Sequence, residues 1–186
     1  MEARIVHVEI EGTSPYSPSR FIDVPKKPKE SPADFEDRVW RERCHYDEKT
    51  RKCFIPGICF VKMMHAAAKH EPMVKKGQAT YTKHFERGLM VPGDLDLGIK
   101  VEDVQCQSLM VPSDGKAGGG KRVRKHFPIF QNWGGIVSFH IFDHAITEKQ
   151  FEPTLENGRL FIGIGRWRPE KCGWNGRFKV VNMKWE

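Results

Sequence analysis

The chain of 186 residues is long enough for one domain to bury a hydrophobic core without disulfides or structural metals. Its 31 Lys and Arg residues outnumber its 24 Asp and Glu residues, and the formal charge of +7 favours an acidic partner such as nucleic acid. The 12 Phe and 5 Trp residues argue against wholesale disorder, and no apolar run reaches the length of a membrane span. We therefore expect a cytoplasmic protein with a single domain over residues 1–186.

The first part of the chain predicts a strand, a long loop and a helix. Apolar and charged residues alternate over Arg4–Glu11, which is the pattern of a half-buried strand. Turn-forming residues follow, so we expect an extended loop containing Pro and Lys over residues 12–33. A short helix is predicted from Ser31 or Pro32 to Arg43.

The remaining elements complete an alternation of strands and helices. A small strand is predicted at Lys52–Ile55, and the principal helix runs from Pro56 to about His70 with apolar residues at helical spacing. Further strands are predicted at Gly98–Val111, Gly135–Phe142 and Arg159–Ile164, and a helix at Glu148–Asn157. The core order is strand, helix, strand, strand, helix, strand. This order predicts an α+β fold of the modified ferredoxin-like (RRM-like) βαββαβ type, with helices on one face of the sheet.

Glycine, arginine and tryptophan are interleaved near the carboxyl end. Glycine allows a backbone to approach a ligand, arginine supplies a forked cation, and indole offers a stacking face. This combination predicts contact with single-stranded nucleic acid. The alternative is a glycine-rich hairpin with solvated arginines and core tryptophans. The candidate residues are Gly163, Gly165, Arg166, Trp167, Arg168, Gly173, Trp174, Gly176 and Arg177.

A second basic region lies in a glycine-rich segment over residues 112–126, which we expect to form a flexible basic insertion. Its cations could contact phosphates, although a charge run of this kind is often only solvated. They are Lys116, Lys121, Arg122, Arg124 and Lys125.

Three motifs together resemble the RAMP superfamily of CRISPR-associated RNA-binding proteins. The first is the turn Glu11–Tyr16 after the first strand, and the second is Phe54-Ile55-Pro56-Gly57 at the start of the principal helix. The third is the terminal Gly163-x-Gly165-Arg166 with Gly173-x-x-Gly176-Arg177-Phe178.

The resemblance implies a ferredoxin-like subunit that lines up with copies of itself along an RNA, in contact with a glycine-rich loop. It also implies that the basic insertion is a thumb-like hairpin over the bound strand, and that Arg20 and Lys62 contact the RNA backbone. Lys62 lies one position later than the family's lysine, and Arg166-Trp167-Arg168-Pro169 is bulkier than the family's loop. These departures suggest a divergent member, encoded for example by a virus or other mobile element.

An enzyme of this superfamily would use a histidine as general acid or base for metal-independent RNA cleavage. The candidate catalytic residues for this alternative are His126, His140 and His144. We expect no cofactor and no metal, because the five cysteines contain no C-x-x-C pair and no metal-dependent catalytic motif is present. A zinc site from Cys44, His45, Cys53 and Cys59 is the remaining metal alternative.

The leading hypothesis is therefore non-catalytic binding of single-stranded RNA or DNA, with RNA favoured, as a repeating subunit of a ribonucleoprotein assembly. The first alternative is the histidine-dependent endoribonuclease. The second is a structural or interaction protein that mimics or caps a CRISPR-type complex.

Overall fold

The computed structural model of the protein describes residues 3–73, 79–113 and 120–186. It contains a four-stranded antiparallel sheet with the strand order β3-β7-β1-β8, formed by β1 (Arg4–Gly12), β3 (Leu89–Met90), β7 (Gly134–Ile141) and β8 (Phe178–Trp185). A second sheet pairs β2 (Lys52–Ile55) with β4 (Leu95–Lys100), and a third pairs β5 (Gln105–Pro112) with β6 (Arg122–Ile129). The prediction of an α+β fold is confirmed, and the strands of these sheets pair antiparallel.

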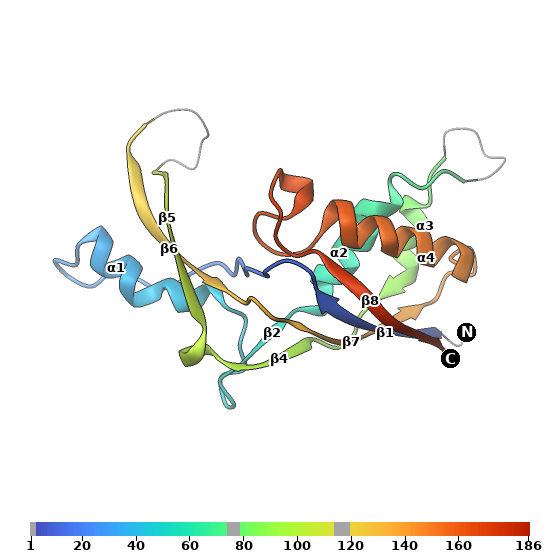
Figure 1. Ribbon diagram of the computed structural model, residues 1–186, viewed down its shortest axis with the longest axis horizontal. Coiled ribbons are helices and arrows are strands. Elements are labelled where there is room, and N and C mark those ends of the chain that lie inside the picture. The colour runs from blue at the N-terminus through green and yellow to red at the C-terminus, as the bar shows by residue number, and fades with distance from the viewer. Residues whose placement is uncertain (1–2, 74–78, 114–119) are drawn as a thin grey trace.

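Helices α2 (Gly57–Ala68) and α4 (Glu148–Asn157) lie on one side of the four-stranded sheet (Figure 1). Val6, Val8 and Ile10 of β1 are buried on this side, together with Phe60 and Met64 of α2. The order β1, α2, β3, β7, α4, β8 and the sheet order are consistent with a ferredoxin-like arrangement. The start of β1 lies beside the end of the chain, where the Glu186 N–H donates to the Ile5 carbonyl at 2.8 Å.

On the opposite face of the sheet, side chains of β1 and β7 are exposed or half-buried. His7 and Glu9 alternate with the buried residues of β1, and Ile136 of β7 is 63% exposed. This alternation is the signature that predicted β1, because successive side chains of a strand point to opposite faces.

Helix α1 (Pro32–Val39) begins at Ser31, whose hydroxyl accepts a hydrogen bond from the Asp34 N–H at 3.1 Å, and Pro32 takes the first helical position. A 3-10 turn, η1 (Trp40–Arg43), continues the helix to the predicted end. Between β1 and α1, residues 13–31 form no regular helix or strand beyond one bridge between Tyr16 and Phe130.

The β5–β6 hairpin and α1 form one end of the molecule, with the hairpin standing beside the main body (Figure 1). Strand β6 includes residues 122–126, so the part of the predicted flexible insertion that the structure describes there is paired strand. The paired residues include Ser108 with His126 and Met110 with Arg124. Residues 114–119 lie outside the described residues.

Three predicted elements differ from the structure. The predicted final strand Arg159–Ile164 is wrong, because residues Gly158–Ile162 form a π-helical turn (η3) that continues α4. The last strand is instead β8. The predicted strand Gly98–Val111 is divided between β4 and β5 by a 3-10 turn, η2 (Val101–Asp103). In chain order, the second strand of the four-stranded sheet is β3 and not the predicted strand Gly98–Val111. It follows a further helix, α3 (Thr82–Gly88), which was not predicted.

Candidate nucleic-acid interface

The glycine-rich loop begins where α4 widens into η3. The Gly163 N–H donates to the Gly158 carbonyl at 2.8 Å, five residues earlier, which is the hydrogen-bond pattern of a π turn. Gly163 then takes a φ of 67° with an extended ψ of −179°, a conformation that is open essentially to glycine alone. The sequence therefore directs the chain sharply out of the helix at this point.

Backbone hydrogen bonds join this loop to the segment that follows β1. The Gly176 N–H donates to the Pro15 carbonyl at 2.8 Å, and the Arg166 N–H donates to the Ser17 carbonyl at 2.7 Å. The Ile164 N–H donates to the Gly176 carbonyl at 3.1 Å, which closes the loop on itself. Two of the three motifs behind the family resemblance thus form one structural unit, although they lie near opposite ends of the chain.

The second motif, Phe54-Ile55-Pro56-Gly57, leads into α2, which forms one wall of a groove of about 510 Å³. The opposite wall is the glycine-rich loop at Gly163 and Gly165, with the 3-10 turn η4 (Pro169–Lys171) behind it. The polar and charged residues that line the groove are Ser19, Lys62, His65, Lys69, Glu86, Arg168 and Glu170. The groove therefore offers a glycine backbone and three cations to a ligand.

The charges in this groove are only partly compensated. Arg168 donates to Glu170 at 2.6 and 2.9 Å, so that pair is internally satisfied. Lys62 and Lys69 are exposed and form no ion pair with any residue that the structure describes. Two lysines are thus available to an anion that enters the groove.

His65 lines the same groove, and one of its ring nitrogens lacks a hydrogen-bond partner among the described residues. This nitrogen is Nε2, and it is buried. Burial lowers the pKa of His65, and Lys69 acts in the same direction, whereas the Phe85 backbone and Glu86 oppose the shift. His65 is therefore held in its neutral form near neutral pH, with an unsatisfied nitrogen.

An aromatic and cationic cluster lies beside the groove, where the glycine-rich loop faces the base of the β5–β6 hairpin. The guanidinium of Arg166 lies 4.6 Å from the centre of the Phe127 ring, and Trp167 packs edge-on against the same ring at 4.8 Å. Arg43 lies over Phe127 at 5.5 Å. The Phe127 ring is therefore shared by two guanidinium groups and an indole.

Only one of these two arginines has a carboxylate partner in the described part of the chain. Arg43 pairs with Glu36 at 3.0 Å, and Glu36 also contacts Lys125 at 3.0 Å. Arg166 is in no ion pair with a described residue, and its Nε is buried without a hydrogen-bond partner there. Burial and the neighbouring Arg43 lower the pKa of Arg166, against the opposing charge of Glu36.

The other predicted loop residues differ in accessibility. Trp174 is 65% exposed, whereas Trp167 is half-buried. The Arg177 side chain donates to the carbonyls of Leu160 at 2.9 Å and Trp174 at 3.2 Å, so it braces the loop from within. Gly173 packs so closely that a Cβ atom would lie 1.8 Å from the Trp167 carbonyl oxygen.

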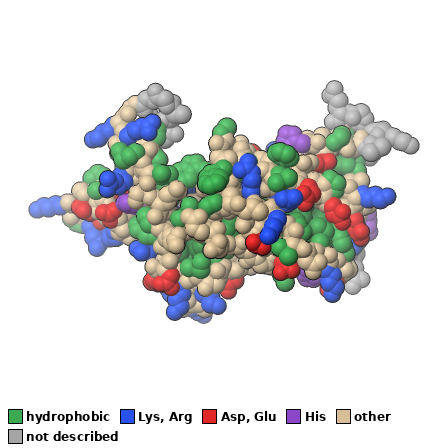
Figure 2. All heavy atoms as spheres, in the orientation of Figure 1, with side chains coloured by type: hydrophobic (Ala, Val, Ile, Leu, Met, Phe, Trp, Pro, Cys, Tyr) green, Lys and Arg blue, Asp and Glu red, His purple; other side chains and the backbone are tan. Residues whose placement is uncertain are grey.

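The predicted cations of the basic insertion and Arg20 are spread more widely. Lys121, Arg122 and Arg124 are exposed on β6 or just before it. In Figure 2, Lys and Arg side chains lie on the outer part of the hairpin, with hydrophobic side chains exposed toward the middle of the molecule. Lys125 instead contacts Glu36. Arg20 lies over the Tyr46 ring at 5.5 Å, and Lys116 falls outside the described residues.

The three candidate catalytic histidines do not meet. His126 is on β6, His140 is on β7, and His144 is exposed in a turn after β7. His126 alone is held on both ring nitrogens, by Ser108 and Asp37. Within residues 3–73, 79–113 and 120–186, no three His, Cys, Asp or Glu side chains gather in a way that could hold a metal ion, so the zinc alternative gains no support.

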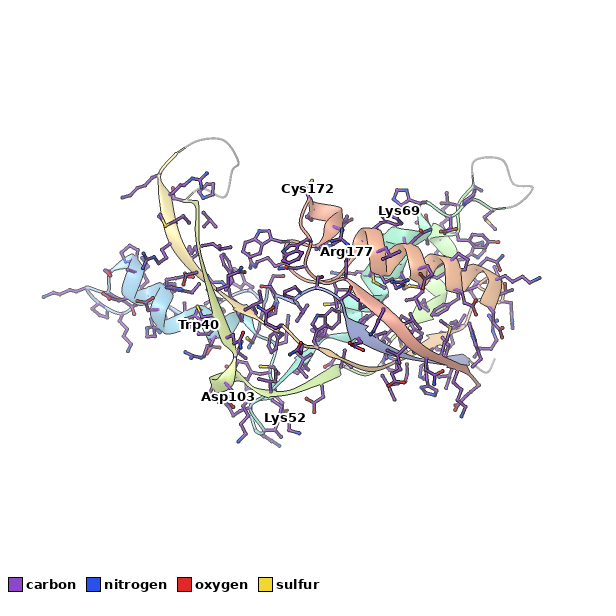
Figure 3. The ribbon with its side chains drawn as sticks, viewed as in Figure 1. Trp40, Lys52, Lys69, Asp103, Cys172 and Arg177 are labelled. Atoms are coloured by element: carbon purple, nitrogen blue, oxygen red, sulfur yellow. The ribbon has the colours of Figure 1, made fainter. Side chains whose placement is uncertain are left out.

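Sequence reasoning missed Ser19, His65 and Lys69 as groove residues. The signal for two of them was present, because Lys62, His65 and Lys69 follow one another at helical spacing on the predicted principal helix and so share one face. Figure 3 shows Lys69 on the same side of the molecule as Arg177 and Cys172, and Lys52 on the opposite side.

No helix in the described residues is both long and apolar enough to span a membrane.

The sequence matches no protein-family profile, and it matches no curated protein. Solved structures are more informative, and 34 of their chains are similar to this one. One is a chain in the cryo-EM structure of the Type III-B Cmr-beta bound to cognate target RNA, with a TM-score of 0.56 and 12% sequence identity. The match covers 99% of this chain and 61% of that chain. The similarity shows that the whole described fold is shared with part of that longer chain.

Proposed function

We propose that this protein binds single-stranded nucleic acid, with RNA favoured, as a RAMP-like subunit of a ribonucleoprotein assembly of the CRISPR type. The observation that carries the proposal is the groove between α2 and the glycine-rich loop, where Lys62 and Lys69 face a glycine backbone. The structural similarity to a chain of an RNA-bound Cmr-beta complex supports RNA as the ligand and other complex subunits as partners. Copies of this chain are a further partner in this proposal.

The chemistry of the groove suits a sugar-phosphate backbone. Lysines neutralise phosphates without selecting a base, and glycines let the strand approach the protein backbone. Beside the groove, the half-buried Trp167 supplies an aromatic surface and Arg166 an uncompensated guanidinium, and both pack on the buried Phe127 ring. The resulting affinity would be strongly salt-dependent and weakly sequence-dependent. Sequence choice would then come from a guide strand or from a partner.

A double substitution tests whether RNA binds in the groove, and a control variant measures the effect of losing the same charge elsewhere. In Lys62→Ala/Lys69→Ala, affinity for a fluorescent oligouridylate should fall about tenfold, and the slope of log K against log salt should fall by roughly 1.4, or about 0.7 per phosphate. Lys52→Ala/Lys100→Ala is the matched control, because it removes the same charge from paired positions on β2 and β4, on the opposite side of the molecule (Figure 3). Equal losses in both variants, measured by fluorescence anisotropy, would refute a binding site in the groove.

The endoribonuclease remains the second candidate because of one observation, the position of His126 between Ser108 and Asp37. Labelled RNA incubated with the protein in EDTA separates the two functions. Cleavage that disappears in His126→Gln would establish the enzyme, whereas intact RNA under binding conditions supports the non-catalytic function. The absorbance ratio of the purified protein at 260 and 280 nm reports bound nucleic acid. It therefore distinguishes these two RNA-dependent functions from that of a protein that only caps a complex.

A further inference from the structure

A cysteine, a serine, a histidine and an aspartate meet between the β5–β6 hairpin and α1. His126 Nδ1 lies 2.7 Å from Ser108 Oγ and 3.5 Å from Cys106 Sγ. On the other side of the ring, His126 Nε2 lies 2.7 Å from Asp37 Oδ1. The same histidine thus connects two potential nucleophiles to one carboxylate.

The carboxylate determines which way the imidazole works. An ionised Asp37 only accepts hydrogen bonds, so the neutral ring carries its proton on Nε2 and donates it to Asp37. Nδ1 is then the basic nitrogen, and it faces Ser108 and Cys106. This is the arrangement of a nucleophile, a general base and an orienting carboxylate.

The thiol is the group that this base activates. A thiol is far more acidic than an alcohol, so proton transfer to imidazole near neutral pH produces a thiolate and not an alkoxide. Ser108 Oγ lies 4.0 Å from Cys106 Sγ and 2.7 Å from the imidazole, so its hydroxyl can turn toward the sulfur once the thiolate forms. Cys106 and Ser108 are exposed, whereas the His126 side chain is only 16% exposed. A fixed base therefore serves an accessible sulfur.

The surroundings favour an anionic reagent. His126 and Asp37 border a groove of about 630 Å³ that Arg124 and Lys125 also line. The Arg43 guanidinium donates to the His126 carbonyl at 3.1 Å. The acidic groups on the same side are Glu36, which contacts Arg43 and Lys125, and Asp37 itself. Around His126, the three cations Arg43, Arg124 and Lys125 therefore exceed the two carboxylates Glu36 and Asp37 by one charge, whereas Cys106 is not among the residues that line this groove.

We propose that Cys106 is a reactive thiol that forms mixed disulfides with small anionic disulfides of the glutathione class. The Cys106 proton passes to His126 Nδ1, and the thiolate attacks one sulfur of the disulfide. A new S–S bond forms to Cys106 while the reagent's S–S bond breaks, and the departing thiolate takes the proton from His126. Cys106 is oxidised and half of the small disulfide is reduced, so the exchange needs no further oxidant. The modification places negative charge at the base of the basic hairpin.

Cys172 provides a control within the same molecule. It is the other exposed cysteine, in the loop after η4. The test is the rate of iodoacetamide alkylation of each cysteine at about pH 6.5, followed by peptide mass spectrometry. At this pH an ordinary thiol is about 1% thiolate. Because His126 Nδ1 lies 3.5 Å from Cys106 Sγ and can accept its proton during the reaction, Cys106 should react about fivefold faster than Cys172.

Two variants connect this rate to the relay. His126→Gln should reduce the Cys106 rate to that of Cys172, and Asp37→Asn, on an exposed helix position, should give an intermediate rate with unchanged thermal unfolding. Oxidised glutathione should then modify Cys106 in preference to Cys172 in the unaltered protein. Equal alkylation of the two cysteines, or a Cys106 rate unchanged by both substitutions, would overturn the proposal. Because these measurements contain no nucleic acid, their outcome is independent of the proposed binding function.

Discussion

The guanidinium of Arg166 lies 4.6 Å from the centre of the Phe127 ring, which brings the glycine-rich loop into contact with the base of the β5–β6 hairpin. Arg166 Nε is buried and unpartnered among the described residues, whereas neighbouring Arg168 is satisfied by Glu170. A buried cationic donor without a partner is unfavourable in the free protein. An approaching phosphate would relieve that cost at Arg166 but would have to compete with Glu170 at Arg168.

The two arginines should therefore contribute unequally to binding. Arg166→Ala should weaken binding of single-stranded RNA about tenfold, as expected for loss of a charged hydrogen bond worth roughly 1.5 kcal/mol. Arg168→Ala should weaken it less than about threefold, because its partner Glu170 already offsets much of its charge. Anisotropy titrations of both variants provide the comparison. A larger loss in Arg168→Ala would contradict this account of the loop.

Glu36 should be the residue that fixes the hairpin on α1. Glu36 is 2% exposed, and its carboxylate accepts hydrogen bonds from the Arg43 and Lys125 side chains and from the His126 N–H. Glu36→Gln leaves these cations without a buried counter-charge, and the free energy of unfolding should fall by about 2–4 kcal/mol. Urea unfolding at neutral pH measures this, with exposed Glu48→Gln as the control.

The same contribution should disappear in acid. Burial raises the pKa of Glu36, but the hydrogen bonds from His126, Lys125 and Arg43 outweigh it, so the pKa in the folded protein is below the ordinary value of 4.5. A carboxyl whose pKa is lowered by folding stabilises the fold above its unfolded pKa and loses this effect as pH falls through the folded value. The difference between the protein and Glu36→Gln should therefore shrink below about pH 4.5. A constant difference down to pH 3 would show that the stabilisation does not depend on the charge.

Three glycines allow steric and conformational costs to be separated. Gly176 has a φ of 73°, and a Cβ there would lie 1.9 Å from the Ile164 carbonyl oxygen. Gly98 has a φ of 66° with no atom near the Cβ position, and Gly93 has neither constraint. Substitution by Ala should lower Tm by roughly 6 °C or more at Gly176 and by about 2–4 °C at Gly98, with almost no change at Gly93. Similar melting of the Gly176 and Gly98 variants would mean that the loop can move aside.

The sequence was most informative where one physical signal dominated. The alternation in Arg4–Glu11 and the Ser31–Pro32 helix start each led to the correct element, because they reflect local geometry. The run Leu160-Phe161-Ile162 was misassigned as a strand, since a short apolar run bounded by glycine fits a strand and a buried helical turn equally well. In the structure this run continues helix α4 as a helical turn, and whether the helix continues depends on tertiary packing.

The candidate site was predictable in composition but not in geometry. The glycines and arginines of the loop and Lys62 were identified, and the structure brings Gly163, Gly165, Lys62 and Arg168 to one groove. The partners that neutralise Arg168 and Lys125 were not predicted. Glu170 is close in sequence to Arg168, but Glu36 reaches Lys125 only because α1 packs on the hairpin.

Trp174 should act as a stacking surface and contribute little to stability. Its side chain is 65% exposed in the loop that Arg177 braces. Trp174→Ala should lower RNA affinity by about 1–3 kcal/mol, the usual value for loss of one base–aromatic stack, with unchanged Tm. Trp174→Phe should retain most of the affinity because it keeps an aromatic face. If all three proteins bind RNA equally, the exposed indole has no part in recognition.

If RNA binds in the groove as proposed, His65 should make the RNA affinity increase as pH falls, whereas protein stability should decrease. Because burial lowers its pKa, the folded protein resists protonation of His65, and its contribution to stability is lost as pH falls below the unfolded value of about 6.5. The charged groups that share the groove with it are Lys62, Lys69, Glu86, Arg168 and Glu170.

A phosphate in the groove would favour the imidazolium and offer its buried Nε2 a partner. RNA affinity should therefore increase by about threefold to tenfold between pH 7.5 and 5.5 while the free protein becomes less stable, as expected for roughly 1 kcal/mol from one added charge contact. His65→Gln should remove much of both trends, whereas His144→Gln, at an exposed turn outside the groove, should change neither. Anisotropy and thermal unfolding over the same pH series provide the two readings. If the RNA affinity of His65→Gln rises equally between pH 7.5 and 5.5, the pH dependence belongs to another group. The unpartnered Nε2 atom would then be a feature of packing alone.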